Sequence, residues 1–186
     1  MQEDLLKSLE VLRKGGVILY PTDTIWGIGC DATNEQAVQR IFRIKKREDS
    51  KSMLILLDSP GRLNGYVTVP EVAWELIEVT TSPLTIIYPG AKNLAKGLIA
   101  EDGSTGIRIT SDEFCIELIK RFGKPIVSTS ANISGTQSPV IFDEIHDEII
   151  SMADYVVKWR QDDSVKRQPS AVIKIEVNGV FKIIRK

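Results

Sequence analysis

Hydroxyl-bearing and basic side chains gather in three short stretches of the sequence. Pro21-Thr22-Asp23-Thr24 and Ser128-Thr129-Ser130-Ala131-Asn132 each follow an apolar run, and the stretch from Lys45 to Lys51 is rich in positive charge. In open α/β sheets, loops that leave the carboxyl ends of strands line the ligand crevice. Hydroxyls and amides there suit a polar small molecule, and Lys and Arg suit phosphate and carboxylate oxygens. The pattern therefore predicts a local pocket for a small anionic ligand.

The common signatures of nucleotide enzymes and of side-chain nucleophiles are missing. There is no GxxxxGK[ST] loop, and Gly27-Ile28-Gly29 lacks the third glycine and the following helix of a dinucleotide fingerprint. The one histidine, His146, stands in the acidic segment DEIHDEII, which favours a surface position over a catalytic triad. Cys30 and Cys115 are far apart in the sequence and are expected to be buried, reduced thiols.

Each of these features also has a purely structural explanation. Basic residues at the end of a helix offset its dipole, which contributes only about 0.3 to 1 kcal/mol. Ser and Thr in loops commonly bond to their own backbone. For Trp26, Trp74 and Trp159, packing in the core or at its rim is the favoured role, although Trp26 lies close enough to Thr24 to wall a pocket.

Composition narrows the class of protein. The 186 residues are 42% hydrophobic and 26% charged, which is typical of a globular domain and excludes a disordered chain. Twenty-four basic and 25 acidic residues give a net charge of -1, so no global positive charge is available for nucleic acid. The longest aliphatic run, Met53 to Leu57, is far too short to cross a bilayer, and we expect a cytoplasmic protein without membrane contact.

Apolar periodicity predicts alternating helices and strands. Helices are expected at 5–12, 37–44, 72–77, 114–122 and 142–150, and strands at 17–20, 51–57, 85–88, 106–109, 125–127, 155–157, 171–177 and 180–184. The continuous apolar strands indicate burial on both faces of a sheet. We predict an α/β fold, a single domain over residues 1–186 in which helices pack on one twisted mixed sheet.

Local signals predict where several of these elements begin and end. Thr33 with Gln36 and Thr110 with Glu113 have the spacing of capping boxes. Gly123 is expected to close its helix in the left-handed conformation, and Asn178-Gly179 to form a hairpin turn with positive φ at both residues. The polar stretch from Arg160 to Gln168 is predicted to be a mobile surface loop.

Four ordered blocks carry a resemblance to a known family. GGVILYPTDTIWGIGCDA, RIKKRED, SPLTIIYPG and IVSTSANISG together resemble the threonylcarbamoyl-AMP synthase family, the YrdC-like domain. Its core signature is matched by Lys45-Lys46-Arg47 and Ser130-Ala131-Asn132, and the resemblance runs from about residue 5 to 185. The chain resembles the short, single-domain form, with a large concave basic cavity implied.

The resemblance implies a nucleotidyltransferase. L-threonine, bicarbonate or CO2, and ATP would give threonylcarbamoyl-AMP and pyrophosphate, and a partner complex would transfer the threonylcarbamoyl group to adenosine 37 of tRNA. The nucleophile at the α-phosphorus would be the carbamate oxygen of the substrate, so the protein would need only to position and stabilise charge. Mg²⁺ would bind through the nucleotide, with no dedicated protein ligands.

The resemblance also implies roles for particular residues, and each is carried over by position. The catalytic set is Lys45, Arg47, Ser130 and Asn132; the threonine contacts are Thr24, Arg108, Ser128 and Ser170; the nucleotide contacts are Arg47, Lys51, Ser130, Asn132, Ser138 and Arg185. Lys45 and Arg47 are expected to be exposed, so their loss should reduce turnover and leave stability unchanged. Three positions depart from the family pattern: Ser82, Thr110 and Ala171, and Ala171 puts one hydroxyl contact in doubt.

Two other functions stay open at this point. A binding module for tRNA or rRNA without catalysis is one alternative, and steep salt dependence of binding would distinguish it. Carbamoyl transfer in hydrogenase maturation is the other. It usually involves further zinc-finger-like and acylphosphatase-like modules, for which 186 residues leave no room.

Overall fold

One sheet of nine strands forms the centre of the computed structural model, which describes residues 1–46 and 53–186. Its order is β7-β1-β2-β6-β3-β5-β4-β8-β9, with parallel and antiparallel pairs mixed. The strands are β1 (Ile18–Tyr20), β2 (Gly27–Gly29), β3 (Leu54–Leu57), β4 (Leu84–Tyr88), β5 (Thr105–Ile109), β6 (Ile126–Ser130), β7 (Tyr155–Val156), β8 (Ala171–Ile175) and β9 (Phe181–Arg185). The predicted α/β class with a mixed, twisted sheet is confirmed.

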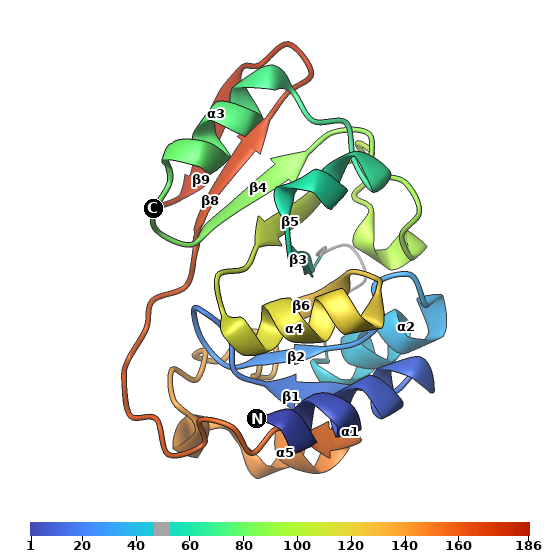
Figure 1. Ribbon diagram of the computed structural model, residues 1–186, viewed down its shortest axis with the longest axis vertical. Coiled ribbons are helices and arrows are strands. Elements are labelled where there is room, and N and C mark those ends of the chain that lie inside the picture. Colours follow the sequence, from blue (N-terminus) through green and yellow to red (C-terminus); the bar gives the residue numbers. More distant parts are fainter. Residues whose placement is uncertain (47–52) are drawn as a thin grey trace.

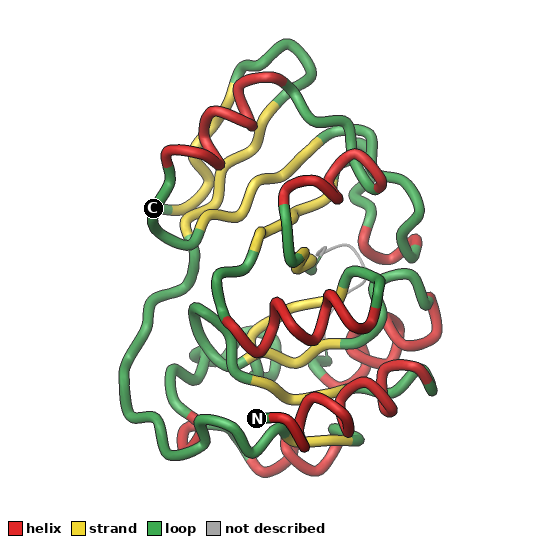
Figure 2. The backbone as a smooth tube through the Cα atoms, in the orientation of Figure 1, coloured by secondary structure: helices red, strands yellow, loops and turns green. Residues whose placement is uncertain are grey.

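Helices cover both faces of this sheet (Figures 1 and 2). In Figure 1, α1 and α4 lie together on the near side of the lower half, and α2 and α5 lie behind it. The helices are α1 (Gln2–Arg13), α2 (Glu35–Ile44), α3 (Glu71–Val79), α4 (Glu113–Phe122) and α5 (Asp147–Met152), with short 3₁₀ turns η1 (Pro60–Gly65), η2 (Lys96–Leu98) and η3 (Phe142–Glu144). None of the helices in the described part of the chain is long and apolar enough to span a bilayer.

The continuous apolar segment that ends in β1 is buried on both faces, as its sequence predicts. Ile18 and Tyr20 face the core formed with α1 and α4, whereas Val17 and Leu19 face the larger core formed with α2. Because strand side chains alternate between faces, a four-residue apolar run supplies both cores at once. The central strands are therefore packed on both faces, and this packing holds the ends of the loops that follow them in place.

Two of the predicted helix caps are wrong by one or two residues. Asn34, not Thr33, caps α2, and its Oδ1 accepts from the amide of Ala37 at 3.2 Å. Asp112, not Thr110, caps α4 by accepting from the amide of Cys115 at 3.0 Å. Asn34 and Asp112 stand directly before the first helical residue, so their side chains, and not those of the threonines, reach the free amides of the first turn.

Strand pairing reaches further into the polar loops than the sequence indicated. β2 lies inside the stretch predicted to be a loop after Tyr20, and β6 continues to Ser130 instead of ending at Val127. β2 and β6 pair antiparallel, Gly27 opposite Ser130. These segments were not predicted as strands because glycines and hydroxyl residues dominate them. Their strand conformation comes from pairing with neighbouring strands and not from local propensity.

The Asn178-Gly179 signal does give a hairpin between β8 and β9, but with another turn. Gly179 has a φ of 85°, whereas Asn178 is not among the residues with positive φ. The amide of Gly179 donates to the carbonyl of Glu176, and the amide of Glu176 donates to Val180. One residue in the left-handed region after a tight turn is the pattern of a three-residue hairpin loop, so the predicted two-residue turn is wrong.

The segment between β7 and β8 runs along one side of the molecule, from the lower half to the upper half (Figure 1). Arg160, at a φ of 65°, anchors it. Its guanidinium donates to Asp112 at 2.6 Å, to the carbonyl of Thr22 at 3.2 Å and to Asp163 at 3.1 Å. The beginning of the predicted mobile loop is thus tied to the start of α4 and to the loop after β1.

Gly29 is expected to be irreplaceable in the sheet. A Cβ at this position would lie 2.1 Å from the backbone oxygen of Val127 and 2.9 Å from the Tyr20 ring, so Gly29→Ala must displace β6. We expect a loss of roughly 1 to 3 kcal/mol, the range for overpacking, in urea unfolding. Gly61→Ala is the matched control, since nothing lies within 4 Å of its added Cβ. Equal midpoints for the two variants would contradict this account of the β2–β6 contact.

Candidate functional site

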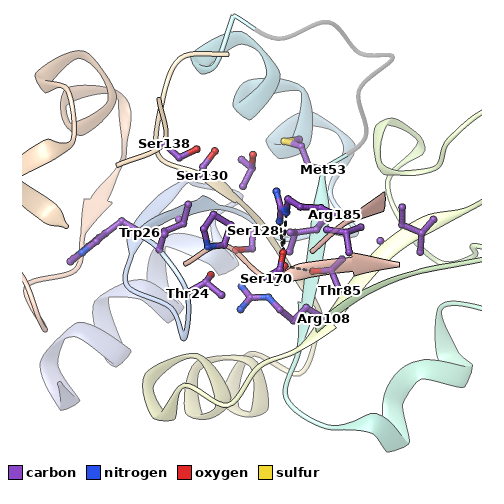
Figure 3. Close-up of a pocket in the computed structure, with 18 residues that line it drawn as sticks. Thr24, Trp26, Met53, Thr85, Arg108, Ser128, Ser130, Ser138, Ser170 and Arg185 are labelled. Atoms are coloured by element: carbon purple, nitrogen blue, oxygen red, sulfur yellow. Dashed lines mark hydrogen bonds between the residues drawn. The ribbon is translucent and has the colours of Figure 1, made fainter. Parts of the chain in front are cut away.

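A hollow of about 280 Å³ lies on one face of the sheet, across the strands from β2 to β9. Figure 3 shows its polar side chains converging from both halves of the chain. Its lining includes seven of the residues predicted for the site: Thr24, Arg108, Ser128, Ser130, Ser138, Ser170 and Arg185. Side chains up to 161 positions apart in sequence, 185 minus 24, therefore share one pocket.

Strand alternation explains why these residues meet. Ser128 and Ser130 of β6 are two positions apart, and so are Gly106 and Arg108 of β5, so each pair points to the same face. Gly27 and Gly106 line the hollow and have no side chain, so at these two positions nothing fills its space. A polar, concave surface follows from small residues flanked by hydroxyls on adjacent strands.

Ser170 is held at both its side chain and its backbone. Its hydroxyl lies 2.8 Å from the hydroxyl of Thr85, and its carbonyl accepts from Nε and Nη2 of Arg185 at 3.0 and 2.7 Å. These contacts join β4, β8 and β9 at one wall of the hollow (Figure 3). Ala171 lies between Ser170 and Val172, which both line the hollow, so alternation turns Ala171 to the other face. A hydroxyl at position 171 would point away from this pocket.

Arg108 is almost fully buried, and it is paired. Its exposed fraction is 2%, its Nη1 donates to Asp23 Oδ1, and Asp23 is also buried. The second oxygen of Asp23 accepts from the amide of Ser111 at 3.1 Å. Among the described residues of the lining, Arg108 and Arg185 are the cations, and a carboxylate balances the first, so the implied large basic cavity stays a prediction.

Lys45 lies behind the hollow and organises one of its walls. Its exposed fraction is 1%, and its Nζ donates to the carbonyl of Ser130, to the carbonyl of Asn132 at 2.6 Å and to Oδ1 of Asn132 at 3.2 Å. In return, the amide of Ser134 donates to the carbonyl of Lys45 at 2.8 Å. The end of α2 and the turn after β6 are thereby joined. The expectation of an exposed Lys45 is wrong, because the turn surrounds its ammonium group.

The remaining predicted residues divide into two groups. Asn132 lies in the Lys45 cluster, where its Nδ2 donates to the carbonyls of Ile133 and Thr136 at 3.0 and 2.7 Å, and it does not line the hollow. Arg47 and Lys51 lie outside the described residues. Met53, the first described residue after them, lines the hollow.

Two residues of the hollow, Thr85 and Trp26, and one residue beside it, Asp23, were missed or undervalued by sequence reasoning. Thr85 lines the hollow from within a strand, where a single hydroxyl carries no signal. Asp23 stood in the quoted hydroxyl-rich loop, and its charge next to Thr24 was the available clue. Trp26 both packs in the core and walls the pocket. It is 4% exposed, its ring centroid lies 5.0 Å from that of Phe142, and it lines the hollow.

Neither thiol is suited to nucleophilic chemistry. Cys30 and Cys115 are buried and free, as predicted, and burial raises the pKa of both. A thiol kept protonated is a weak nucleophile. Among the residues that the structure describes, no group of three or more His, Cys, Asp or Glu side chains is placed to hold a metal ion.

Comparison with known proteins identifies the family. The Sua5/YciO/YrdC family model, described as "Telomere recombination", matches residues 10–186. The chain belongs to the Sua5/YciO/YrdC family. A relative named threonylcarbamoyl-AMP synthase, from Pseudoalteromonas translucida (strain TAC 125), is 33% identical over 186 residues, which cover 97% of this chain and 98% of that protein.

Solved structures of the Sua5/YciO/YrdC family agree in fold. YciO of E. coli superposes with a TM-score of 0.86 at 26% identity and covers 100% of this chain and 90% of its own. Sua5 of P. abyssi complexed with L-threonine superposes with a TM-score of 0.82 at 25% identity over 92% of this chain. The chain spans 50% of that Sua5 chain, so the match concerns one part of the longer protein.

The buried position of Lys45 gives this member of the family a stability prediction that reverses the sequence-based one. In Lys45→Met, the carbonyls of Ser130 and Asn132 lose a donor, and each buried group left unsatisfied costs about 1 to 3 kcal/mol. We expect a clearly lower midpoint in urea unfolding than for the wild type. Lys14→Met is the control, because the side chain of Lys14 is 72% exposed and pairs with Glu10 on the surface. An unchanged midpoint for Lys45→Met would restore the view of Lys45 as a freely exposed cation.

Proposed function

We propose that this chain is a threonylcarbamoyl-AMP synthase, forming threonylcarbamoyl-AMP and pyrophosphate from L-threonine, ATP, and bicarbonate or CO2. The observation that carries the proposal is the convergence of Thr24, Ser128, Ser170 and Arg108 on one hollow. Hydroxyls and a guanidinium are suited to the hydroxyl and the carboxylate of threonine. The family membership, the named relative and the Sua5 complex with L-threonine support the same substrate.

The chemistry needs no nucleophile from the protein. Once the amine of threonine has taken up CO2, a carbamate oxygen attacks the α-phosphorus of ATP, the new P–O bond forms, and pyrophosphate leaves with the electron pair. The work of the protein is to align these groups and to stabilise charge. The protonated thiols, and the absence of an imidazole from the lining, are compatible with such a site.

We assign the nucleotide to the side of the hollow formed by Ser130, Ser138 and Arg185, with Arg47 and Lys51 as further phosphate contacts. Lys45 and Asn132 keep the catalytic signature together by fixing the turn that carries Ser130. Mg²⁺ is proposed to bind through phosphate oxygens of ATP. In nucleotide enzymes Mg²⁺ is commonly bound through the phosphates of the substrate and not by a dedicated protein cage.

Downstream, the adenylate would be consumed by a transfer complex that modifies adenosine 37 of tRNA, and the reaction would take place in the cytoplasm. The RNA-binding alternative is less well supported. Among the described residues, the hollow is a single pocket with two arginines, one of them balanced by Asp23, whereas RNA binding depends on many cations that neutralise successive phosphates along a strand.

The direct test is formation of the adenylate. The purified chain is incubated with ATP, L-threonine, bicarbonate and Mg²⁺, and the products are analysed by mass spectrometry. We expect threonylcarbamoyl-AMP and pyrophosphate, dependent on every substrate. Reactions without threonine, and with D-threonine in its place, are the controls. An ATP turnover that is indifferent to threonine would refute the assignment.

Arg185 offers a test of the nucleotide side within one strand. Arg185→Met removes the guanidinium from the hollow, and we expect kcat/KM for ATP to fall at least about tenfold, or ~1.4 kcal/mol. Lys182→Met removes an equal charge from β9 at a residue that does not line the hollow, and should change kcat/KM less than about twofold. Equal effects in both variants would indicate that net charge, and not this contact, is what matters.

A further inference from the structure

Asp23 is a buried carboxylate with a defined partner on each oxygen. Oδ1 accepts from Nη1 of Arg108, and Oδ2 accepts from the amide of Ser111 at 3.1 Å and lies 3.4 Å from its hydroxyl. The side chains of Asp23 and Arg108 are only 7% and 2% exposed. Ser111, just before α4, thus holds the Asp23 carboxylate in place. The carboxylate in turn restrains the guanidinium of Arg108.

Arg108, by contrast, is only partly satisfied. Its Nε is buried and has no hydrogen-bond partner among the described residues, although Nη1 is bound to Asp23. In a guanidinium, Nε–H and one N–H of Nη2 form a parallel fork on the edge away from Nη1, and this fork matches the two oxygens of a carboxylate. The side chain projects into the hollow near Thr24 and Ser170 (Figure 3). A buried donor without an acceptor next to a pocket calls for an acceptor supplied by the ligand.

We propose that Asp23 is a positioning residue that aims the Nε–Nη2 fork of Arg108 at the carboxylate of the amino-acid substrate. This inference rests on the proposed function, because it takes the ligand to be L-threonine. By holding Nη1, Asp23 removes rotation of the guanidinium about its last torsions. The fork is then preorganised, and the substrate does not have to order it on binding.

The pairing also sets selectivity. An arginine whose guanidinium could rotate would meet an anion in many orientations. With Nη1 held by Asp23, the fork has one orientation, and affinity depends on two directed hydrogen bonds. The site therefore discriminates in favour of a planar carboxylate in the correct orientation. It should bind an uncharged amide in the same place much more weakly.

The test measures this discrimination by isothermal titration calorimetry with L-threonine and L-threoninamide as probes. For the wild type, we expect L-threonine to bind at least tenfold more tightly than L-threoninamide. In Asp23→Asn, which keeps the shape of the side chain, the affinity for L-threonine should fall at least tenfold, while that for L-threoninamide changes less than about twofold. Asp31→Asn is the matched control, since Asp31 is an equally buried carboxylate paired with Lys124 at 2.7 Å and away from the hollow.

The outcomes separate the inference from the proposed function. If the wild type binds neither probe, the proposed function and the inference fall together. If the wild type prefers L-threonine but Asp23→Asn weakens both probes equally, or neither, Asp23 is merely structural and the inference alone is wrong. Should Asp23→Asn fail to fold, Asp23→Glu decides, because glutamate keeps the charge and its extra methylene shifts the point at which Nη1 is held. Retained discrimination in Asp23→Glu would overturn the inference, and its loss would support it.

Discussion

The pairing of β6 with β2 on one side and β3 on the other is the constraint on which the rest of the structure depends. Both pairings are antiparallel, and they connect the smaller group of strands around β1 with the larger group that ends at β9. At Gly29 the neighbouring backbone oxygen comes so close that no side chain fits. This tight seam fixes the direction in which β6 leaves the sheet, and hence where Ser128 and Ser130 present their hydroxyls.

Two buried cations then complete the site in different ways. The ammonium group of Lys45 donates to the backbone carbonyls of Ser130 and Asn132 and so connects α2 to the turn after β6. Arg108 is held along one side by Asp23 and keeps a donor toward the hollow. A buried charge is tolerated only where acceptors surround it. In the first case those acceptors are carbonyls of the chain itself, and in the second they are shared between an aspartate and the proposed ligand.

Much of the architecture could be predicted from the sequence, and the failures have a common physical origin. Apolar periodicity located α1, α2 and β1, because burial on a core leaves a strong pattern. The strand character of Gly27–Gly29 was invisible, since glycine has low strand propensity and the strand is held by pairing with β1 and with the distant β6. The set of residues around the hollow followed from the family resemblance. The partners of those residues did not: neither the burial of Lys45 nor the contact of Arg108 with Asp23 has a local signature in the sequence.

The composition of the hollow has a kinetic consequence. Its walls come from the loop after β1 and from the outermost strand, β9, so the contacts that enclose it join parts of the chain with very large sequence separation. Closing such long loops is slow, and contacts of this kind form late during folding. A binding surface therefore exists only once these distant parts of the chain have come together. Substrate would then recognise the fully folded chain alone.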